Sequence, residues 1–268
     1  MAQNKLSGHL GYLFNEVPLA QRMKAAADTG FTAVEHPSPF AIPAREMRSA
    51  IDELGLSFAQ LAGGAGDASR GEKGLACLPG REGDFRAGFD SAVDYAMTVG
   101  AAYVHPMAGV PDNGDLARAQ EVYLENIGYA VDAASKAGVK VLIEAISGAA
   151  VPGYFVPTLQ RAAAIQDVFG TDRISLLVDT FHAAVTEIDL PAWIGANGHR
   201  IGHVHIADFP GRHEPGTGML TFEPILAALQ AEGYAGAIGF EYIPSTATSA
   251  SASFLPDWQR LLSEKISP

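Results

Sequence analysis

Short apolar segments alternate with longer amphipathic segments along the whole chain. In residues 174–178 four of five side chains are aliphatic, which is typical of a strand buried on both faces. Residues 84–99 show the other pattern, because Phe85, Phe89, Val93 and Met97 repeat every four positions, as on one face of a helix. Glycines such as Gly100 follow the amphipathic segments, where helices commonly end. The pattern predicts an α/β protein.

Eight strands and eight helices are expected from this alternation. The first strand is a short one within residues 5–13 that contains His9, and the others fall at residues 31–35, 56–61, 101–105, 139–144, 174–179, 201–206 and 237–241. The helices fall at residues 18–29, 44–54, 84–99, 115–137, 157–169, 191–197, 221–232 and 254–266, and Asp84 is expected to cap the third. Eight such units in 268 residues predict a single (β/α)8 TIM barrel over residues 1–268. The alternative, a doubly wound open sheet, normally carries a glycine-rich fingerprint after its first strand, and residues 9–14 do not match one.

Four of the later expected strands each carry a charged or titratable residue at or near the carboxyl end. These residues are Glu144, Asp179, His205 and Glu241. In a TIM barrel the carboxyl ends of all strands face one mouth, so the four side chains are expected to converge there. Three carboxylates and one imidazole suit a divalent cation such as Mg²⁺, Mn²⁺ or Co²⁺. The alternative interpretation is that each is an ordinary polar residue at a strand end.

Further candidates lie close to these strand ends. His182 follows Asp179 by three residues and is a candidate for binding a substrate oxygen, or else a helix-start histidine with local partners. Arg212 lies in the glycine-rich loop at residues 211–218 and is a candidate for holding a substrate carboxylate or hydroxyl. His203 is interpreted as a packed interior histidine.

Charge and composition narrow the classes of partner. The net charge of −12 argues against a nucleic-acid surface and against an anionic membrane. No stretch of 18 apolar residues is present, and the first residues contain no apolar segment typical of a signal peptide. Cys77 is the single cysteine, so no internal disulfide forms. We therefore expect a cytoplasmic protein with a small-molecule substrate, and these features are compatible with a homo-oligomer.

Several motifs together resemble the hydroxypyruvate isomerase family, within the xylose-isomerase-like TIM barrels, over essentially the full length. The motifs are residues 71–86, 142–144, 201–203, 206–208, 214–218 and 241–242. The resemblance implies one metal ion bound by Glu144, Asp179, His205 and Glu241, with the two glutamates also acting as catalytic groups that transfer protons.

Some residues depart from that family. It tends to have Gln at the position of His205, Asn near the end of the first strand, where this chain has His9, and Glu at the position of Met219. Its Glu-Pro-Ile-Asn-His motif corresponds to residues 144–148, which read Glu-Ala-Ile-Ser-Gly. The Glu, Asp, His, Glu set and residues 179–182 resemble ketose 3-epimerases instead. We include His9 with His182 and Arg212 among the expected substrate-binding residues.

The expected activity is a metal-dependent isomerisation of a small α-hydroxycarbonyl compound through an enediolate, most directly hydroxypyruvate to tartronate semialdehyde. A ketose 3-epimerase and a 2-oxo-tetronate isomerase are the alternatives that share its first half-reaction. Two other classes are a non-catalytic sugar-binding barrel, disfavoured because both glutamates are present, and an abasic-site nuclease, disfavoured by the acidic charge.

Overall fold

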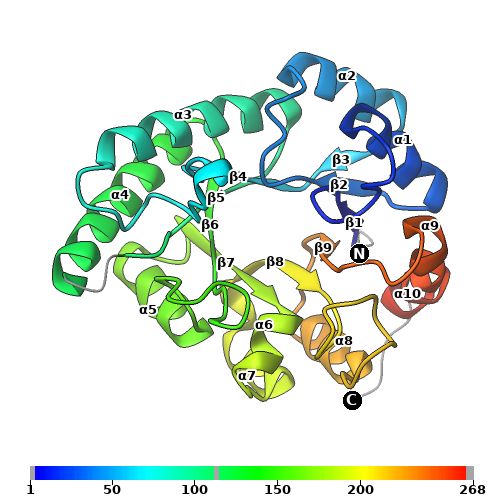
Figure 1. Cartoon of the computed structure of the whole chain (residues 1–268). Helices are drawn as coiled ribbons and strands as arrows, with labels where there is room; N and C mark the ends of the chain where they lie inside the picture. The colour runs from blue at the N-terminus through cyan, green and yellow to red at the C-terminus, as the bar shows by residue number, and fades with distance from the viewer. Residues whose placement is uncertain (1–3, 112–114, 264–268) are drawn as a thin grey trace. The chain divides into compact units, whose positions relative to one another are not determined.

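Parallel strands alternate with helices in this computed structural model, which describes residues 4–111 and 115–263 (Figure 1). The strands are β1 (Leu6–His9), β2 (Ala33–Glu35), β3 (Ser57–Phe58), β4 (Gln60–Gly63), β5 (Tyr103–Pro106), β6 (Lys140–Glu144), β7 (Ile174–Asp179), β8 (Ile201–Ile206) and β9 (Ile238–Phe240). The longer helices are α1 (Leu19–Thr29), α2 (Ala44–Glu53), α3 (Glu82–Val99), α4 (Leu116–Lys136), α5 (Leu159–Phe169), α7 (Leu190–Asn197), α8 (Phe222–Ala231) and α10 (Leu255–Ser263). Shorter helices are η1 (Ala68–Arg70), α6 (Thr180–Val185), η2 (Gly198–Arg200), α9 (Thr248–Ser251) and η3 (Ala252–Phe254). The predicted alternation is confirmed, and the end of the last expected helix lies outside the described residues.

The strand order in the sheet is β3-β2-β1-β9-β8-β7-β6-β5-β4. The pairs β1–β2, β1–β9, β2–β3, β4–β5, β5–β6 and β8–β9 are all parallel. Parallel pairing directs the carboxyl ends of neighbouring strands to the same edge of the sheet, where the predicted site residues lie.

Helix ends follow the sequence signals. Gly30 and Gly100 end α1 and α3 with φ of 108° and 76°, a left-handed conformation that costs glycine little. Asp115 caps α4, because its side chain accepts a hydrogen bond of 2.9 Å from the amide of Arg118. These local signals therefore predict the boundaries correctly.

The prediction of a single third strand at residues 56–61 is wrong, because this segment contributes to two strands, β3 and β4. Ser57 of β3 pairs with Ala33 of β2, whereas Gln60 of β4 pairs with Tyr103 of β5. Each half of the segment is thus hydrogen-bonded to a different neighbour, and the change occurs around Ala59. The described residues consequently contain nine strands instead of eight.

Two details expected for the third helix are also wrong. The helix begins at Glu82, so Asp84 lies inside its first turn and accepts a hydrogen bond of 2.6 Å from Nε of Arg81 instead of capping. Met97 is 55% exposed, although Phe85 and Phe89 are fully buried. A four-residue repeat drifts by about 40° per step around a helix of 3.6 residues per turn, so the fourth member leaves the buried face.

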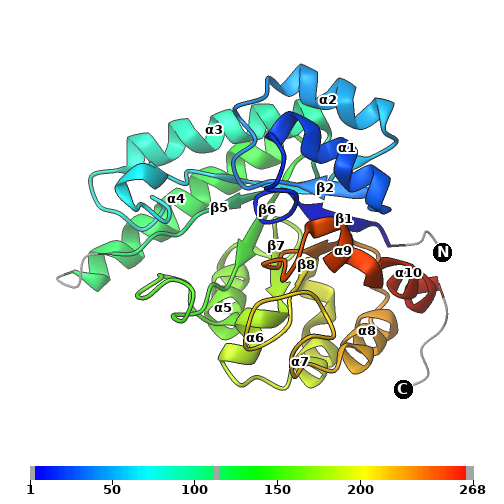
Figure 2. The same ribbon diagram turned by 45° about the vertical axis from the view of Figure 1, so that its right-hand side comes forward.

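Two compact units divide the chain. The first contains residues 1–35, 49–59 and 177–268, and the second contains residues 36–48 and 60–176. In the first, Phe240 packs against Phe31, Phe254 and Trp258 with ring centroids 4.9 to 6.0 Å apart. Helices α7 and α8 of this unit lie side by side (Figure 2). A single domain over residues 1–268 stays a prediction.

The second unit has its core between β4, β5 and β6 and helices α3 and α4. Phe85 and Phe89 of α3 stack with centroids 5.8 Å apart, and Tyr123 of α4 contacts Phe155 at 5.0 Å. Cys77 is fully buried, and this burial raises the pKa of its thiol to about 12. This environment favours a structural role for Cys77, since a thiol that stays protonated is a poor nucleophile.

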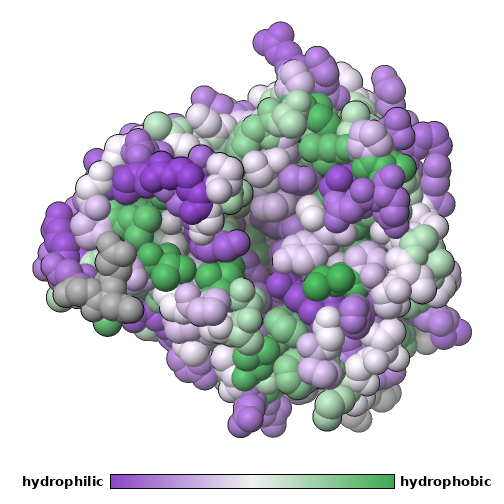
Figure 3. Space-filling view, viewed as in Figure 1, coloured by the Kyte–Doolittle hydropathy of each residue, from purple (hydrophilic) through white to green (hydrophobic). Residues whose placement is uncertain are grey.

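Hydrophilic and hydrophobic side chains are mixed on the face shown in Figure 3, where the hydrophobic ones form separate small areas. The large hydrophobic side chains that are exposed among the described residues are Phe40, Met97, Val110, Leu116, Val168, Met219 and Ile243. No helix within residues 4–111 and 115–263 has the length and apolar character that a membrane span requires.

Candidate active site

Three of the predicted metal ligands meet in the first unit. Asp179 is the last residue of β7, His205 is the fifth residue of β8, and Glu241 directly follows β9. One ligand atom from each lies within 4.8 Å of the ligand atoms of the other two. The side chains are almost fully buried, with 2%, 2% and 9% of the residue surface exposed. Two carboxylates and an imidazole are thus gathered out of water.

Glu144, the fourth predicted ligand, is the last residue of β6 in the second unit. It is buried, with 6% exposed, and its Oε2 lies 3.5 Å from Nδ1 of His105 on the neighbouring strand β5. A carboxylate at this depth is costly without a compensating cation or hydrogen-bond donors. The role of Glu144 as a metal ligand and proton carrier stays a prediction.

Arg212 lies among the carboxylates of the first unit. Its Nη2 is 2.5 Å from Oε2 of Glu241 and 3.3 Å from Oδ2 of Asp179. The guanidinium also lies over the rings of Tyr12 and Phe181, 5.0 and 5.2 Å from their centroids. Such stacking orients a guanidinium while leaving its N–H donors available in the ring plane.

His9 and His182 each lie beside one of the predicted ligands. Nε2 of His9 is 3.2 Å from Oε1 of Glu241. Nε2 of His182 is 3.7 Å from Oδ2 of Asp179, and the backbone amides of Phe181 and His182 donate to Oδ1 of the same carboxylate. Asp179 therefore caps α6 with one oxygen and directs the other toward His182 and Arg212.

Burial and charge act in opposite directions on the titratable groups here. Burial alone would raise the pKa of Glu241, but the charges of Arg212, His9 and His205 outweigh it and hold this pKa well below its usual value. Burial lowers the pKa of His9, against the opposing influence of Glu241 and Glu35. Glu241 is consequently a carboxylate at neutral pH, the form that a general base requires.

Asp208 shapes the loop that carries Arg212. Its two oxygens accept hydrogen bonds of 2.8 to 3.0 Å from the amides of Phe209, Gly216, Gly218 and Leu220. A Cβ at Gly218 would overlap with the carbonyl oxygen of Phe209, so the loop closes tightly only with glycine there. Asp208 is 1% exposed, and its bonds fix a loop in which Arg212 itself adopts φ of 54°.

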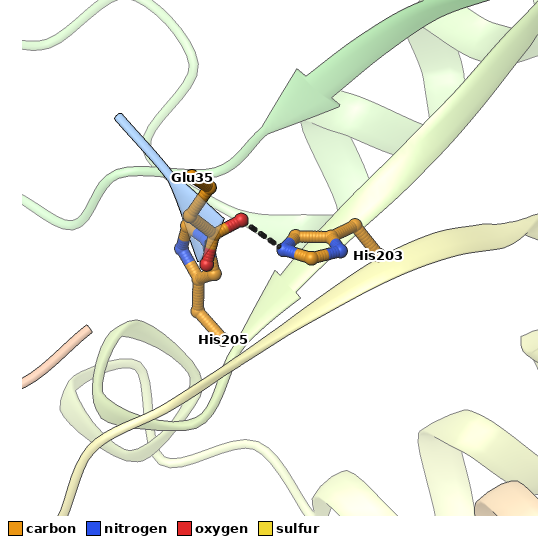
Figure 4. A group of neighbouring side chains, drawn as sticks. All are labelled: Glu35, His203 and His205. Atoms are coloured by element: carbon orange, nitrogen blue, oxygen red, sulfur yellow. Dashed lines mark ion pairs between the residues drawn. The ribbon is translucent and has the colours of Figure 1, made fainter. Parts of the chain in front are cut away.

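Glu35 and His203 also belong to this part of the first unit, although sequence reasoning did not select Glu35. Figure 4 shows the Glu35 carboxylate directed toward the rings of His203 and His205. Its Oε2 lies 2.7 Å from Nε2 of His203, and its Oε1 lies 3.4 Å from Nε2 of His205. Burial alone would raise the pKa of Glu35, but the two histidines lower it. Glu35 ends the apolar strand β2, the same signal that singled out Glu144 and Glu241.

The donor set of the first unit fits a divalent cation. Asp179 and Glu241 supply hard oxygen donors and His205 an imidazole nitrogen, a combination that suits Mg²⁺, Mn²⁺ or Co²⁺ better than a thiophilic ion. Two buried carboxylates this close also demand a cation nearby, and Arg212 supplies a positive charge at the same oxygens.

Comparisons with known proteins identify the family. Residues 23–258 match the model of the xylose isomerase-like TIM barrel family. A 2-oxo-tetronate isomerase of Cupriavidus necator is 38% identical over 94% of this chain and 97% of its own length. The hydroxypyruvate isomerase of Escherichia coli is 30% identical over 95% of this chain and 99% of its own. A crystal structure of an AP endonuclease, family 2, from Brucella melitensis has a TM-score of 0.90 at 30% identity, and covers 95% of this chain and 99% of that one.

The predicted fold class and the predicted family resemblance are both confirmed by these matches. The relatives named as isomerases span nearly the whole chain, so the similarity includes all the strands that carry the site. The chain belongs to the xylose isomerase-like TIM barrel family and is an isomerase.

Proposed function

We propose that this isomerase is metal-dependent and acts on a small 2-oxo acid that carries a neighbouring hydroxyl group, with hydroxypyruvate as its substrate and tartronate semialdehyde as the product. The observation that carries the proposal is Arg212 beside Asp179, His205 and Glu241 in one buried cluster. Such a cluster combines ligands for a cation with a guanidinium suited to a substrate carboxylate.

Asp179, His205 and Glu241 would hold the divalent ion, and Glu144 is proposed as the fourth ligand. Glu144 is proposed because it is a buried carboxylate at the end of its own strand, as Asp179 is at the end of β7. The bound ion would act as a Lewis acid that stabilises negative charge on the substrate's carbonyl and hydroxyl oxygens.

The two glutamates are proposed to move the protons. One removes a proton from C3 of hydroxypyruvate, which gives an enediolate across C2 and C3, and a proton then returns to C2 to form the aldehyde. Glu241 is assigned as the abstracting base because it lies beside Asp179 and His205 in the buried cluster, where the Arg212 guanidinium keeps its carboxylate ionised. His9, 3.2 Å from Glu241, keeps that carboxylate oriented. Glu144 is assigned to the second transfer.

Arg212 is proposed to bind the substrate carboxylate, with His182 and His9 contributing contacts to its oxygens. The rings of Tyr12 and Phe181 support the guanidinium from the positions described above. A planar guanidinium binds a carboxylate through two parallel N–H donors, which fixes the orientation of the acid as well as its position.

Two alternatives share the first proton transfer. The Cupriavidus necator relative favours the four-carbon 2-oxo-tetronate, which is the same chemical class with one additional carbon. The run from Asp179 to His182, with His205 as a ligand, favours a ketose 3-epimerase, in which the proton returns to the same carbon.

Proton NMR in D₂O with Mg²⁺ or Mn²⁺ tests the proposal and separates the alternatives. Hydroxypyruvate, 2-oxo-tetronate and a series of ketoses are each offered to the enzyme, and a duplex with one abasic site serves as the nuclease arm. We expect tartronate semialdehyde with deuterium at C2, and no cleavage of the DNA. Turnover that persists after removal of all divalent ions would contradict metal dependence, and exchange only at C3 of a ketose would identify the epimerase.

A further inference from the structure

A buried cluster is formed by Glu35, His203 and His205. The steps proposed above use His205 as a metal ligand but give no role to Glu35 or His203. The three residues are 0%, 1% and 2% exposed. Glu35 comes from β2 and both histidines from β8, and Figure 4 shows the carboxylate between the two rings. A carboxylate with no exposure is expensive unless each oxygen faces a donor. Here each oxygen faces one imidazole Nε2.

The contact between Glu35 and the two histidines depends on the fold of the first unit. Strands β1 and β9 separate β2 from β8 in the sheet order, which in a flat sheet is a span of about 14 Å. Side chains from β2 and β8 meet only because the sheet curls and because Gly239 of β9 has no side chain. A Cβ at Gly239 would overlap with Oε1 of Glu35 and lie 2.9 Å from Nε2 of His203. The space at Gly239 is therefore filled by the cluster.

The same three residues offer ligand atoms within 4.8 Å of one another, so a second metal site is the competing explanation. Two ligands bound to one ion at about 2.1 Å, with ordinary angles between them, lie about 3.0–3.4 Å apart. Oε2 of Glu35 and Nε2 of His203 are 2.7 Å apart, which is closer than two ligands of one ion. This separation favours direct contact between the carboxylate and the ring over a shared metal ion.

The two nitrogens of the His205 ring face different partners. Nε2 lies 3.4 Å from Oε1 of Glu35, and Nδ1 lies 3.4 Å from Oε2 of Glu241. A carboxylate beside a ring nitrogen favours the proton on that nitrogen. Both nitrogens face a carboxylate, but Oε2 of Glu241 is already paired with Nη2 of Arg212 at 2.5 Å, so Glu35 is the stronger acceptor and the lone pair is left on Nδ1. We propose that Glu35, anchored by His203, is a positioning residue that keeps the proton of His205 on Nε2 and the Nδ1 lone pair directed toward Asp179 and Glu241.

This inference rests on the proposed function, in which His205 binds the divalent ion. It assigns the ligand atom of His205 as Nδ1 and makes Glu35 a residue that acts on the metal through His205. Partners of this kind change metal affinity typically by about 10–100-fold when they are replaced. Glu35→Gln keeps the size of the side chain and removes its charge, and the exposed Glu223→Gln in α8 is the matched control.

The test has two independent measurements on the full-length protein. Long-range ¹⁵N NMR of the metal-free wild type gives the tautomer of His205, and Mn²⁺ titration followed by electron paramagnetic resonance gives affinity and stoichiometry. We expect the Nε2–H tautomer, one Mn²⁺ per chain, affinity lowered about 10–100-fold in Glu35→Gln, and no change in Glu223→Gln. Activity of Glu35→Gln should recover toward wild type as Mn²⁺ is raised.

Several results would overturn the inference. The Nδ1–H tautomer in the wild type would contradict it without any variant. A second Mn²⁺ that disappears in Glu35→Gln would establish the competing metal site. Unchanged affinity and tautomer in a folded Glu35→Gln would leave Glu35 with a structural role only. If the wild type bound no divalent ion, the proposed function would fail, and a tautomer that depends on Glu35 would still support the positioning of His205.

Discussion

The side-chain hydroxyl of Thr180 donates a hydrogen bond of 2.7 Å to the carbonyl of Ala207 and accepts one of 3.0 Å from the amide of the same residue. Thr180 directly follows Asp179, and Ala207 lies two residues beyond His205. The double hydrogen bond thus joins the ends of β7 and β8 at the point where two predicted metal ligands emerge. Thr180 is 1% exposed, so water does not compete for these bonds.

Thr180→Val should destabilise the protein, because it keeps the shape of the side chain and leaves a buried amide and a buried carbonyl without this partner. We expect a loss of about 2–4 kcal/mol in the free energy of unfolding, measured by urea denaturation, and weaker binding of Mn²⁺. Thr180→Ser retains the hydroxyl and is the matched control. Equal stability of the Val and Ser variants would show that the hydroxyl contributes nothing.

Arg212→Ala should raise KM for an acid substrate more than it lowers kcat. The reason is that a contact which stabilises the bound substrate and the transition state equally affects KM alone when it is removed. Arg212→Lys keeps the positive charge but loses the paired donors and the stacking on Tyr12, so it should recover only part of the affinity. Steady-state kinetics with hydroxypyruvate and with an uncharged ketose provide the check. An increase in KM of the same size for both substrates would exclude a carboxylate-binding role.

Glu144→Gln and Glu241→Gln should each retain a bound divalent ion and lose most turnover, since the amide keeps one ligating oxygen but cannot act as a base. General acid–base groups typically contribute about 10²–10⁴-fold to the rate. Metal content by plasma emission spectroscopy and turnover by NMR are measured on the same samples. A variant that keeps near-normal turnover with metal bound would show that its glutamate is only a ligand.

The same two variants should differ in hydrogen exchange. If Glu241 abstracts the proton, Glu241→Gln fails to exchange the carbon-bound hydrogen of the substrate with D₂O, whereas Glu144→Gln still exchanges it without forming product. The opposite pattern would assign proton abstraction to Glu144 and the second proton transfer to Glu241.

Glu72 should make stability depend on pH in the acid range. Hydrogen bonds from the Arg81 side chain and the Asp67 amide lower the pKa of Glu72 from 4.5 to about 2. A carboxyl group with a lowered folded-state pKa stabilises the protein fully above the unfolded value, and this contribution is lost as pH falls toward the folded value. The Tm difference between wild type and Glu72→Gln should therefore shrink from pH 7 to pH 3. The exposed Glu125→Gln is the control, and a difference that is constant over this range would contradict the linkage.

Local sequence signals determined most of the secondary structure. Aliphatic composition placed β6, β7 and β8, and glycine or aspartate at the ends placed α1, α3 and α4 within a few residues. These signals act within one element, because a helix or strand is set by its own backbone hydrogen bonds and by which of its faces is buried. The division of residues 56–61 into β3 and β4 could not be read in this way, since it depends on which neighbour each half pairs with.

The sequence alone also placed Asp179, His205 and Glu241 at or near strand ends, and the parallel sheet then brought them together. Only the tertiary structure decided that Arg212 contacts two of those carboxylates and that Glu35 contacts His203 and His205. Glu35 and His205 are separated by 170 positions in the chain, so no local pattern relates them. Their contact depends on strand order, on the curl of the sheet and on the missing side chain at Gly239, which exist only once the strands have paired.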